Sequence, residues 1–315
     1  MGKRNTKLTG PDFKLDKEQF TILNKEFYEG FLDEFYTVKV INLLSLITNS
    51  KKFINDISKR PIEIEKLQLV PNGQPIEDQS IIKYAKVELA MTYFHCLETF
   101  IRLFIAHSRF SGCPWLDLAR LSIKKYKEEL NKISEGKFNH LNQQYNEDET
   151  ILYVFTGRRK PDNTITKEFI EGYKNWLSFA ASQLLETYDY NSFKHGLAVT
   201  PSQNGLTISK QDETPLFEVY GEVIEHLTRM RQGDRQIWAK QINFVKYDKK
   251  ATFILILEKM MKSILDVGRA DYLRNGHKEV IIFKAHELLP KDILIDDENG
   301  EIHMDRYLKG LLYFE

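Results

Sequence analysis

Long runs of apolar residues at helical spacing constrain the fold of this chain more than any other feature. In the clearest of them, from about residue 166 to 196, large apolar residues recur three or four positions apart. A stripe of this kind belongs to a helix with one face against a core. Gly196 suits the left-handed residue that ends such a helix. Further stripes predict helices over 16–48, 78–109 and 117–134, and the first contains Phe20, Leu23, Phe27, Phe31, Phe35, Val38 and Ile41.

After Gly196 the apolar pattern changes to that of strands. Residues 197–199 and 206–208 predict a hairpin whose turn is Pro201–Gly205, and residues 216–227 and 237–247 predict two antiparallel strands joined around Gly233-Asp234. A further helix follows over 248–267, and Glu298-Asn299-Gly300 predicts a final hairpin. Because helices precede strands, we expect an α+β fold, with a bundle of long α-helices followed by a small antiparallel β-sheet and a further helix.

This order of elements also predicts the domain organisation. We expect a helical bundle over residues 1–196, with the sheet, the C-terminal helix and the hairpin over 197–315 packed on it. The segments 61–75 and 140–150 are rich in turn-forming or polar residues and predict loops. Residues 152–155 are too short an apolar run to assign alone.

Composition narrows the functional classes. The 45 Lys and Arg balance the 45 Asp and Glu, which argues against a strongly basic nucleic-acid coat but leaves room for a local patch. Two cysteines, Cys96 and Cys113, form neither a disulfide framework nor a zinc knuckle, and neither a phosphate-binding P-loop nor an H-E-x-x-H motif is present. Without a secretory signal or a long uncharged apolar run, we expect a cytoplasmic protein with no membrane partner, no metal and no cofactor.

The segment from Tyr188 to Gly196 is the most informative for chemistry. Asn191 and His195 are four positions apart and therefore share one helix face, with Lys194 beside them. The partial negative charge at a helix C-terminus raises the pKa of a histidine there, so His195 could act as a general acid–base group. Lys194 could bind a phosphate and Asn191 could orient it. The alternative is that Lys194 and His195 simply cap the last carbonyls of the helix.

Two other groups of residues could support a site. One face of the predicted helix 78–109 carries His95, Glu98 and Arg102. Glu98 could orient His195 while Arg102 supplies positive charge. The alternative is that Glu98 and Arg102 form an ordinary surface ion pair. An enzyme that acts on a small molecule at this polar face is a further possibility. Basic residues that alternate with an aromatic side chain are suited to binding single-stranded RNA. The predicted RNA-binding residues are Arg158, Arg159, Arg229, Arg231, Arg235 and Trp238. The alternative is that these residues lie in solvated loops.

The segment Asn191-Ser192-Phe193-Lys194-His195-Gly196, at the end of a long helix that follows one with Glu98 and Arg102, resembles the HEPN-type helical bundles over about residues 80–196. The resemblance implies a bacterial, metal-independent endoribonuclease of phage defence or a toxin–antitoxin system. His195 takes the position of the motif histidine and Asn191 that of the polar residue four before it. The resemblance also implies a homodimer with a composite site, and a partner protein from the same operon. Tyr190 stands where the family has arginine, so the alternative is a catalytically inactive adaptor or RNA-binding protein.

Overall fold

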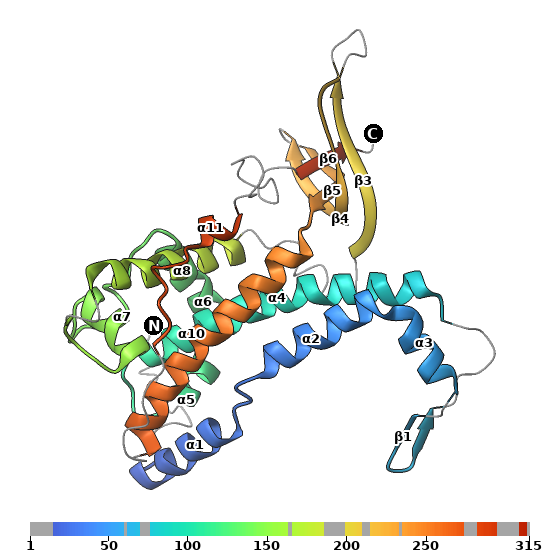
Figure 1. Ribbon diagram of the computed structural model, residues 1–315. Coiled ribbons are helices and arrows are strands. Elements are labelled where there is room, and N and C mark those ends of the chain that lie inside the picture. Colours follow the sequence, from blue (N-terminus) through green and yellow to red (C-terminus); the bar gives the residue numbers. More distant parts are fainter. Residues whose placement is uncertain are drawn as a thin grey trace, which may run out of the picture. The chain divides into compact units, whose positions relative to one another are not determined.

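The computed structural model describes residues 15–59, 62–69, 76–162, 166–185, 199–209, 215–232, 235–273, 282–294 and 309–313 (Figure 1). Within these ranges the fold is α+β, as predicted, with long helices, an antiparallel sheet and a later helix. The helices are α1 (Lys17–Gly30), α2 (Phe35–Thr48), α3 (Ser50–Lys59), α4 (Asp78–Ser108), α5 (Pro114–Arg120), α6 (Ile123–Ser134), α7 (Glu147–Thr156), α8 (Lys167–Leu185), α10 (Tyr247–Leu273) and α11 (Pro290–Leu294). The strands are β1 (Ile62–Ile64), β2 (Leu67–Leu69), β3 (Val199–Ser209), β4 (Pro215–Gln232), β5 (Arg235–Phe244) and β6 (Lys309–Tyr313).

The chain divides into two compact units whose segments alternate along the sequence. The first unit comprises residues 1–33, 99–181 and 259–287, and the second comprises 34–98, 182–258 and 288–315. Helices α4 and α10 each contribute one part to each unit.

Aromatic stacking builds the core of the first unit. The Phe155 ring of α7 stacks on Tyr173 of α8, with centroids 3.9 Å apart, and on Phe104 of α4, with centroids 5.9 Å apart. Trp176, one turn after Tyr173, is fully buried. The stripe predicted for this helix therefore faces a core from Phe169 to Ala181, while residues 186–198, including the predicted helix end, lie outside the described residues.

The sheet of the second unit has the order β3-β4-β5-β6, with every neighbouring pair antiparallel. The predicted hairpin between β4 and β5 is confirmed, since Gln232 pairs with Arg235 across residues 233–234. The predicted turn at Pro201–Gly205 is wrong, because residues 199–209 pair continuously with β4. Strand β3 is at the edge of the sheet, where a proline does not interrupt a central hydrogen-bond ladder.

The single helix predicted over 16–48 is in fact two helices, α1 and α2. Asp16 caps α1, accepting a hydrogen bond from the backbone N–H of Gln19 at 2.9 Å. The start of α2 has no local cap; instead the Glu258 carboxylate of α10 accepts the N–H groups of Tyr36 at 2.7 Å and Thr37 at 3.0 Å. The break also changes which residues face the core, and Phe35, Val38 and Ile41 of the predicted apolar stripe are exposed.

Two shorter predictions also need correction, and a segment left unassigned is now placed in a helix. The helix predicted over 117–134 is divided into α5, which begins at Pro114, and α6, which Ser122 caps. Residues 152–155 belong to α7, which begins with a capping box formed by Asn146 and Glu149. The loop predicted over 61–75 contains the two-stranded ribbon β1–β2. The hairpin predicted at 298–300 lies outside the described residues.

In the described part of the chain, α4 is the one helix that is long and apolar enough to cross a membrane by length and composition. Of its most apolar window of 18 residues, 72% is buried inside the fold. Core helices of soluble proteins pass the same test, so this is weak evidence for a membrane span.

Candidate functional site

The hairpin formed by β4 and β5 brings together most of the residues predicted to contact RNA. Arg229 pairs with Trp238 in the register, and Arg231 pairs with Gln236 two positions further along the same face. Leu227 pairs with Lys240 on this face as well. We refer to these positions, namely Leu227, Arg229, Arg231, Trp238 and Lys240, as the Trp238 face.

Burial identifies the Trp238 face as the open side of this end of the hairpin. Trp238 is 50% exposed and Leu227 is 57% exposed, whereas Thr228 and Ala239 at neighbouring positions on the other face are buried. A half-exposed indole offers a flat apolar surface for stacking. The Nζ of Lys240 lies 2.7 Å from a carboxylate oxygen of Glu225, so this cation already has an acidic partner.

Arg235 does not belong to the Trp238 face. Its register partner is Gln232, and three positions separate it from Trp238 along β5, so it takes the opposite face of the sheet. Arg235, Arg229 and Arg231 are close along the chain, which is why one site was predicted for all three. Strand alternation separates them.

The other predicted basic pair, Arg158 and Arg159, follows α7 in the first unit and has partners within the chain. Arg158 forms an ion pair with Asp162. The Arg159 guanidinium lies 4.1 Å from the ring centroid of Tyr145 and 5.1 Å from that of Tyr153. Cation–π contacts of this kind hold the guanidinium in place. Both arginines are nevertheless exposed.

The residues predicted to support catalysis are placed only in part. His195, Asn191 and Lys194 lie outside the described residues. Glu98 is half-buried on α4, in the second unit. In the first unit, the Arg102 guanidinium lies 4.2 Å from the ring centroid of Tyr126 on α6. Arg102 therefore contributes to packing as a cation over an aromatic ring, a role that the sequence alone did not suggest.

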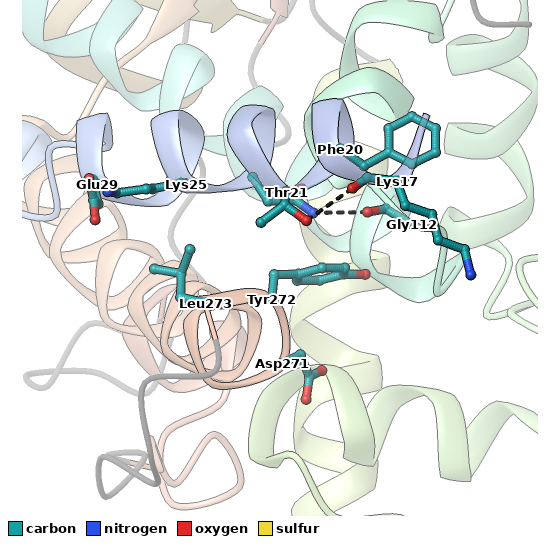
Figure 2. Close-up of a pocket in the computed structure, with 10 residues that line it drawn as sticks. Lys17, Phe20, Thr21, Lys25, Glu29, Gly112, Asp271, Tyr272 and Leu273 are labelled. Atoms are coloured by element: carbon teal, nitrogen blue, oxygen red, sulfur yellow. Dashed lines mark hydrogen bonds between the residues drawn. The ribbon is translucent and has the colours of Figure 1, made fainter. Parts of the chain in front are cut away.

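A pocket of about 680 Å³ opens in the first unit between α1 and the end of α10 (Figure 2). Lys17, Phe20 and Thr21 of α1 and Asp271 and Tyr272 of α10 are among the residues that line it. No sequence pattern signals this pocket, because its walls come from segments about 250 positions apart in the chain.

The polar groups of this pocket largely serve the fold itself. The Asn24 amide donates to the Gly112 carbonyl at 2.9 Å, and the Tyr272 hydroxyl donates to the Ser111 carbonyl at 2.7 Å. Asp271 accepts the Tyr153 hydroxyl at 3.0 Å, and burial raises the pKa of this carboxyl. These bonds fix the corner between α4 and α5 against α1 and α10, and we assign no ligand to the pocket.

His107 is a buried polar residue in the core of the first unit. Its Nδ1 lies 2.8 Å from the Leu103 carbonyl, and its Nε2 lies 2.9 Å from the Tyr28 hydroxyl. Since a carbonyl only accepts, Nδ1 carries the proton and the Tyr28 hydroxyl donates to Nε2. Burial lowers the pKa of His107 to about 4, despite the opposing effect of the Leu103 carbonyl. This imidazole is neutral at physiological pH and closed to substrate.

The described residues contain no group of three or more His, Cys, Asp or Glu side chains that could hold a metal ion. Burial raises the pKa of both cysteine thiols, which disfavours their reactive thiolate forms. Compared with protein-family models, with curated proteins and with solved structures, the chain has no match.

Proposed function

We propose that this chain binds single-stranded RNA at the Trp238 face. The observation that carries the proposal is the register of the β4–β5 hairpin, which sets Arg229 opposite a half-exposed Trp238 and adds Arg231 on the same face. An indole stacks on bases of any sequence, and adjacent cations attract the phosphates that link them. Bases in a duplex are already stacked on each other, which favours a single strand as the ligand.

The charge balance of the chain sets the expected strength of this interaction. With a net charge of zero, the protein attracts RNA only locally, through the cations of one face. If two or three phosphates are contacted, the logarithm of the binding constant should fall with the logarithm of salt concentration with a slope of about −2. A much steeper slope would indicate a larger basic surface elsewhere.

Fluorescence anisotropy with a labelled oligouridine tests the proposal. Trp238→Ala should weaken binding by roughly 5- to 150-fold, the loss of one stacked base. Arg229→Ala should weaken binding and reduce the salt slope by about one unit. Arg235→Ala is the matched control, because it removes the same charge from the opposite face of the same hairpin. If Trp238→Ala binds like the wild type, or if the two arginine variants are equally impaired, the Trp238 face is not the binding site.

The second candidate activity is metal-independent RNA cleavage by a HEPN-like bacterial protein of phage defence or a toxin–antitoxin system. It is supported by the spacing of Asn191, Lys194 and His195 just after α8. His195 would act as the acid–base group and Lys194 would hold the phosphate, in a homodimer as the resemblance implies.

An RNA cleavage assay in EDTA separates this activity from binding alone. The wild type should cut a single-stranded substrate in the chelator, and His195→Ala should abolish cleavage while binding at the Trp238 face persists. A wild type that binds but does not cut would leave an inactive adaptor or RNA-binding protein. Cleavage by His195→Ala, or its loss in EDTA, would refute the catalytic assignment.

A further inference from the structure

The side of the β4–β5 hairpin that carries the Trp238 face changes from open to buried along the strands (Figure 1). Trp238 and Leu227 are exposed, and Lys240 is half-buried. One step further along the same side, Ile242 of β5 is 7% exposed and Glu225 of β4 is 9% exposed. The open part of this side therefore ends where Lys240 and Glu225 lie.

Lys240 and Glu225 form an ion pair at this boundary. The Nζ of Lys240 lies 2.7 Å from a carboxylate oxygen of Glu225. In the register, Lys240 is opposite Leu227 and Glu225 is opposite Ile242, so the two charged residues are diagonal neighbours on the same side of the sheet. The Lys240 side chain is 32% exposed and that of Glu225 is 11% exposed, so the lysine is the more accessible partner.

Glu225 is the one acidic residue of the described strands that takes a position on this side of the sheet. The other acidic residues of β4, Glu218 and Glu222, take positions on the opposite side. Strand β3 has no charged residue, and its position opposite Glu225 is Thr200. Among these strands, the charge of Lys240 is therefore balanced by a single carboxylate.

An RNA phosphate beside Trp238 has to compete with this carboxylate for Lys240. Removing the partner of a mostly buried carboxylate is costly, because the remaining charge is poorly solvated. A contact between an accessible lysine and one phosphate contributes little by comparison. We therefore expect Lys240 to stay with Glu225 when RNA binds, and the phosphates to contact Arg229 and Arg231.

We propose that Glu225 is an autoinhibitory residue of the RNA site, which withholds Lys240 from the phosphates and limits the site to the open end of the hairpin. This inference rests on the proposed binding of RNA at the Trp238 face. Glu225 has a positioning role in it, since the carboxylate acts through Lys240 and does not contact RNA. Without the charge of Glu225, Lys240 becomes a third cation beside Trp238.

Fluorescence anisotropy with labelled oligouridine at several salt concentrations tests the proposal. Glu225→Gln removes the charge and keeps the size of the side chain, so binding should tighten about 3- to 10-fold at low salt. The slope of the logarithm of the binding constant against that of salt concentration should steepen by about 0.7, the value for one phosphate of a single strand. Glu222→Gln is the matched control, because it removes a carboxylate, paired with Lys86, from the opposite side of the same strand. It should leave both quantities unchanged.

A double variant separates the release of Lys240 from the mere loss of a negative charge. When Lys240→Gln is added to Glu225→Gln, no cation is released, so the double variant should bind RNA like the wild type. If it binds as tightly as Glu225→Gln alone, the gain comes from reduced repulsion and the proposal is wrong. Glu225→Ala is a second variant that releases Lys240, and it should also tighten binding. Circular dichroism checks that each variant is folded.

The outcomes also distinguish this proposal from the proposed function. If the wild type binds RNA and neither Glu225→Gln nor Glu225→Ala binds more tightly or with a steeper salt slope, the RNA site stands and the role of Glu225 is refuted. If Glu222→Gln tightens binding as much as Glu225→Gln, the effect is one of overall charge and the role of Glu225 is again refuted. If neither the wild type nor the Glu225 variants bind RNA, both proposals fail.

Discussion

Gly172→Ala should destabilise the first unit, because there is no room for a methyl group at this position of α8. A Cβ added to Gly172 would lie 2.6 Å from the backbone N and 2.7 Å from the Cα of His286, and 2.8 Å from the carbonyl carbon of Ala285. Carbon atoms pack favourably at about 3.5–4.0 Å, so the backbone of residues 283–287 must move by roughly 1 Å. These neighbours are backbone atoms and cannot rotate away as a side chain would.

The segment that must move is held in place. The Tyr173 hydroxyl donates to the Phe283 carbonyl at 2.6 Å, Ala285 is fully buried, and the His286 ring lies 5.6 Å from that of Phe169. Overpacking typically costs about 1–3 kcal/mol, and a lost hydrogen bond adds about 1 kcal/mol. The better helix propensity of alanine returns up to about 1 kcal/mol. We therefore expect a net loss of about 1–3 kcal/mol in the free energy of unfolding.

Urea unfolding, followed by the fluorescence of the tryptophans, measures this loss as a lower midpoint at constant slope. Gly30→Ala is the matched control, because Gly30 is also a helix residue but has no atom within 4 Å of its added Cβ. It should be neutral or stabilising by up to about 1 kcal/mol. If both variants gain stability alike, residues 283–287 do not pack tightly on Gly172.

Two further predictions concern buried polar groups. Glu258→Gln should lower the free energy of unfolding by about 1–3 kcal/mol, because the amide presents a donor to the N–H groups of Tyr36 and Thr37. Glu135→Gln is the control, because it alters an exposed ion pair and should change this free energy little. Urea unfolding measures both variants. Because His107 is neutral in the folded state, the free energy of unfolding of the wild type should fall by about 2 kcal/mol between pH 7.5 and pH 5. In the unfolded chain this imidazole is protonated below about pH 6.5, whereas in the folded state, where its pKa is about 4, it stays unprotonated over this range. His107→Gln should remove this part of the pH dependence, and an unchanged difference between the two pH values would show that His107 is not buried and neutral.

The elements that the sequence predicted well are those with local signals. Helices α4 and α10 have long apolar stripes, and the hairpin between β4 and β5 has a turn signal at residues 233–234. The register of this hairpin follows from its turn, so the position of Arg235 on the opposite face from Arg229 is itself a local property of the sequence. In contrast, the pocket beside Tyr272 depends on distant segments and has no local signal.

The division between α1 and α2 shows why the remainder could not be predicted. Glu258, which caps α2, is more than 220 positions away from the residues that it binds. Arg269 holds Asp33, the residue just before the second unit, from a similar distance along the chain. A regular apolar spacing carries no record of such contacts, and the predicted helix therefore continued through residues 31–34.

The same break explains why apolar spacing identified the wrong face of α2 as core. Periodicity establishes which residues share a helix face, but it cannot establish what covers that face. Helix α2 is apolar on both sides, so Val38 and Ile41 continued the stripe of α1 while Tyr36, Val40 and Leu43 carried the true core. A helix that is apolar all round is normally buried all round. In α2 the polar residues Asn42 and Ser45 are exposed beside Val38 and Ile41, so the outward side of this helix is mixed and the place of Val38 and Ile41 in the stripe reflects spacing and not burial.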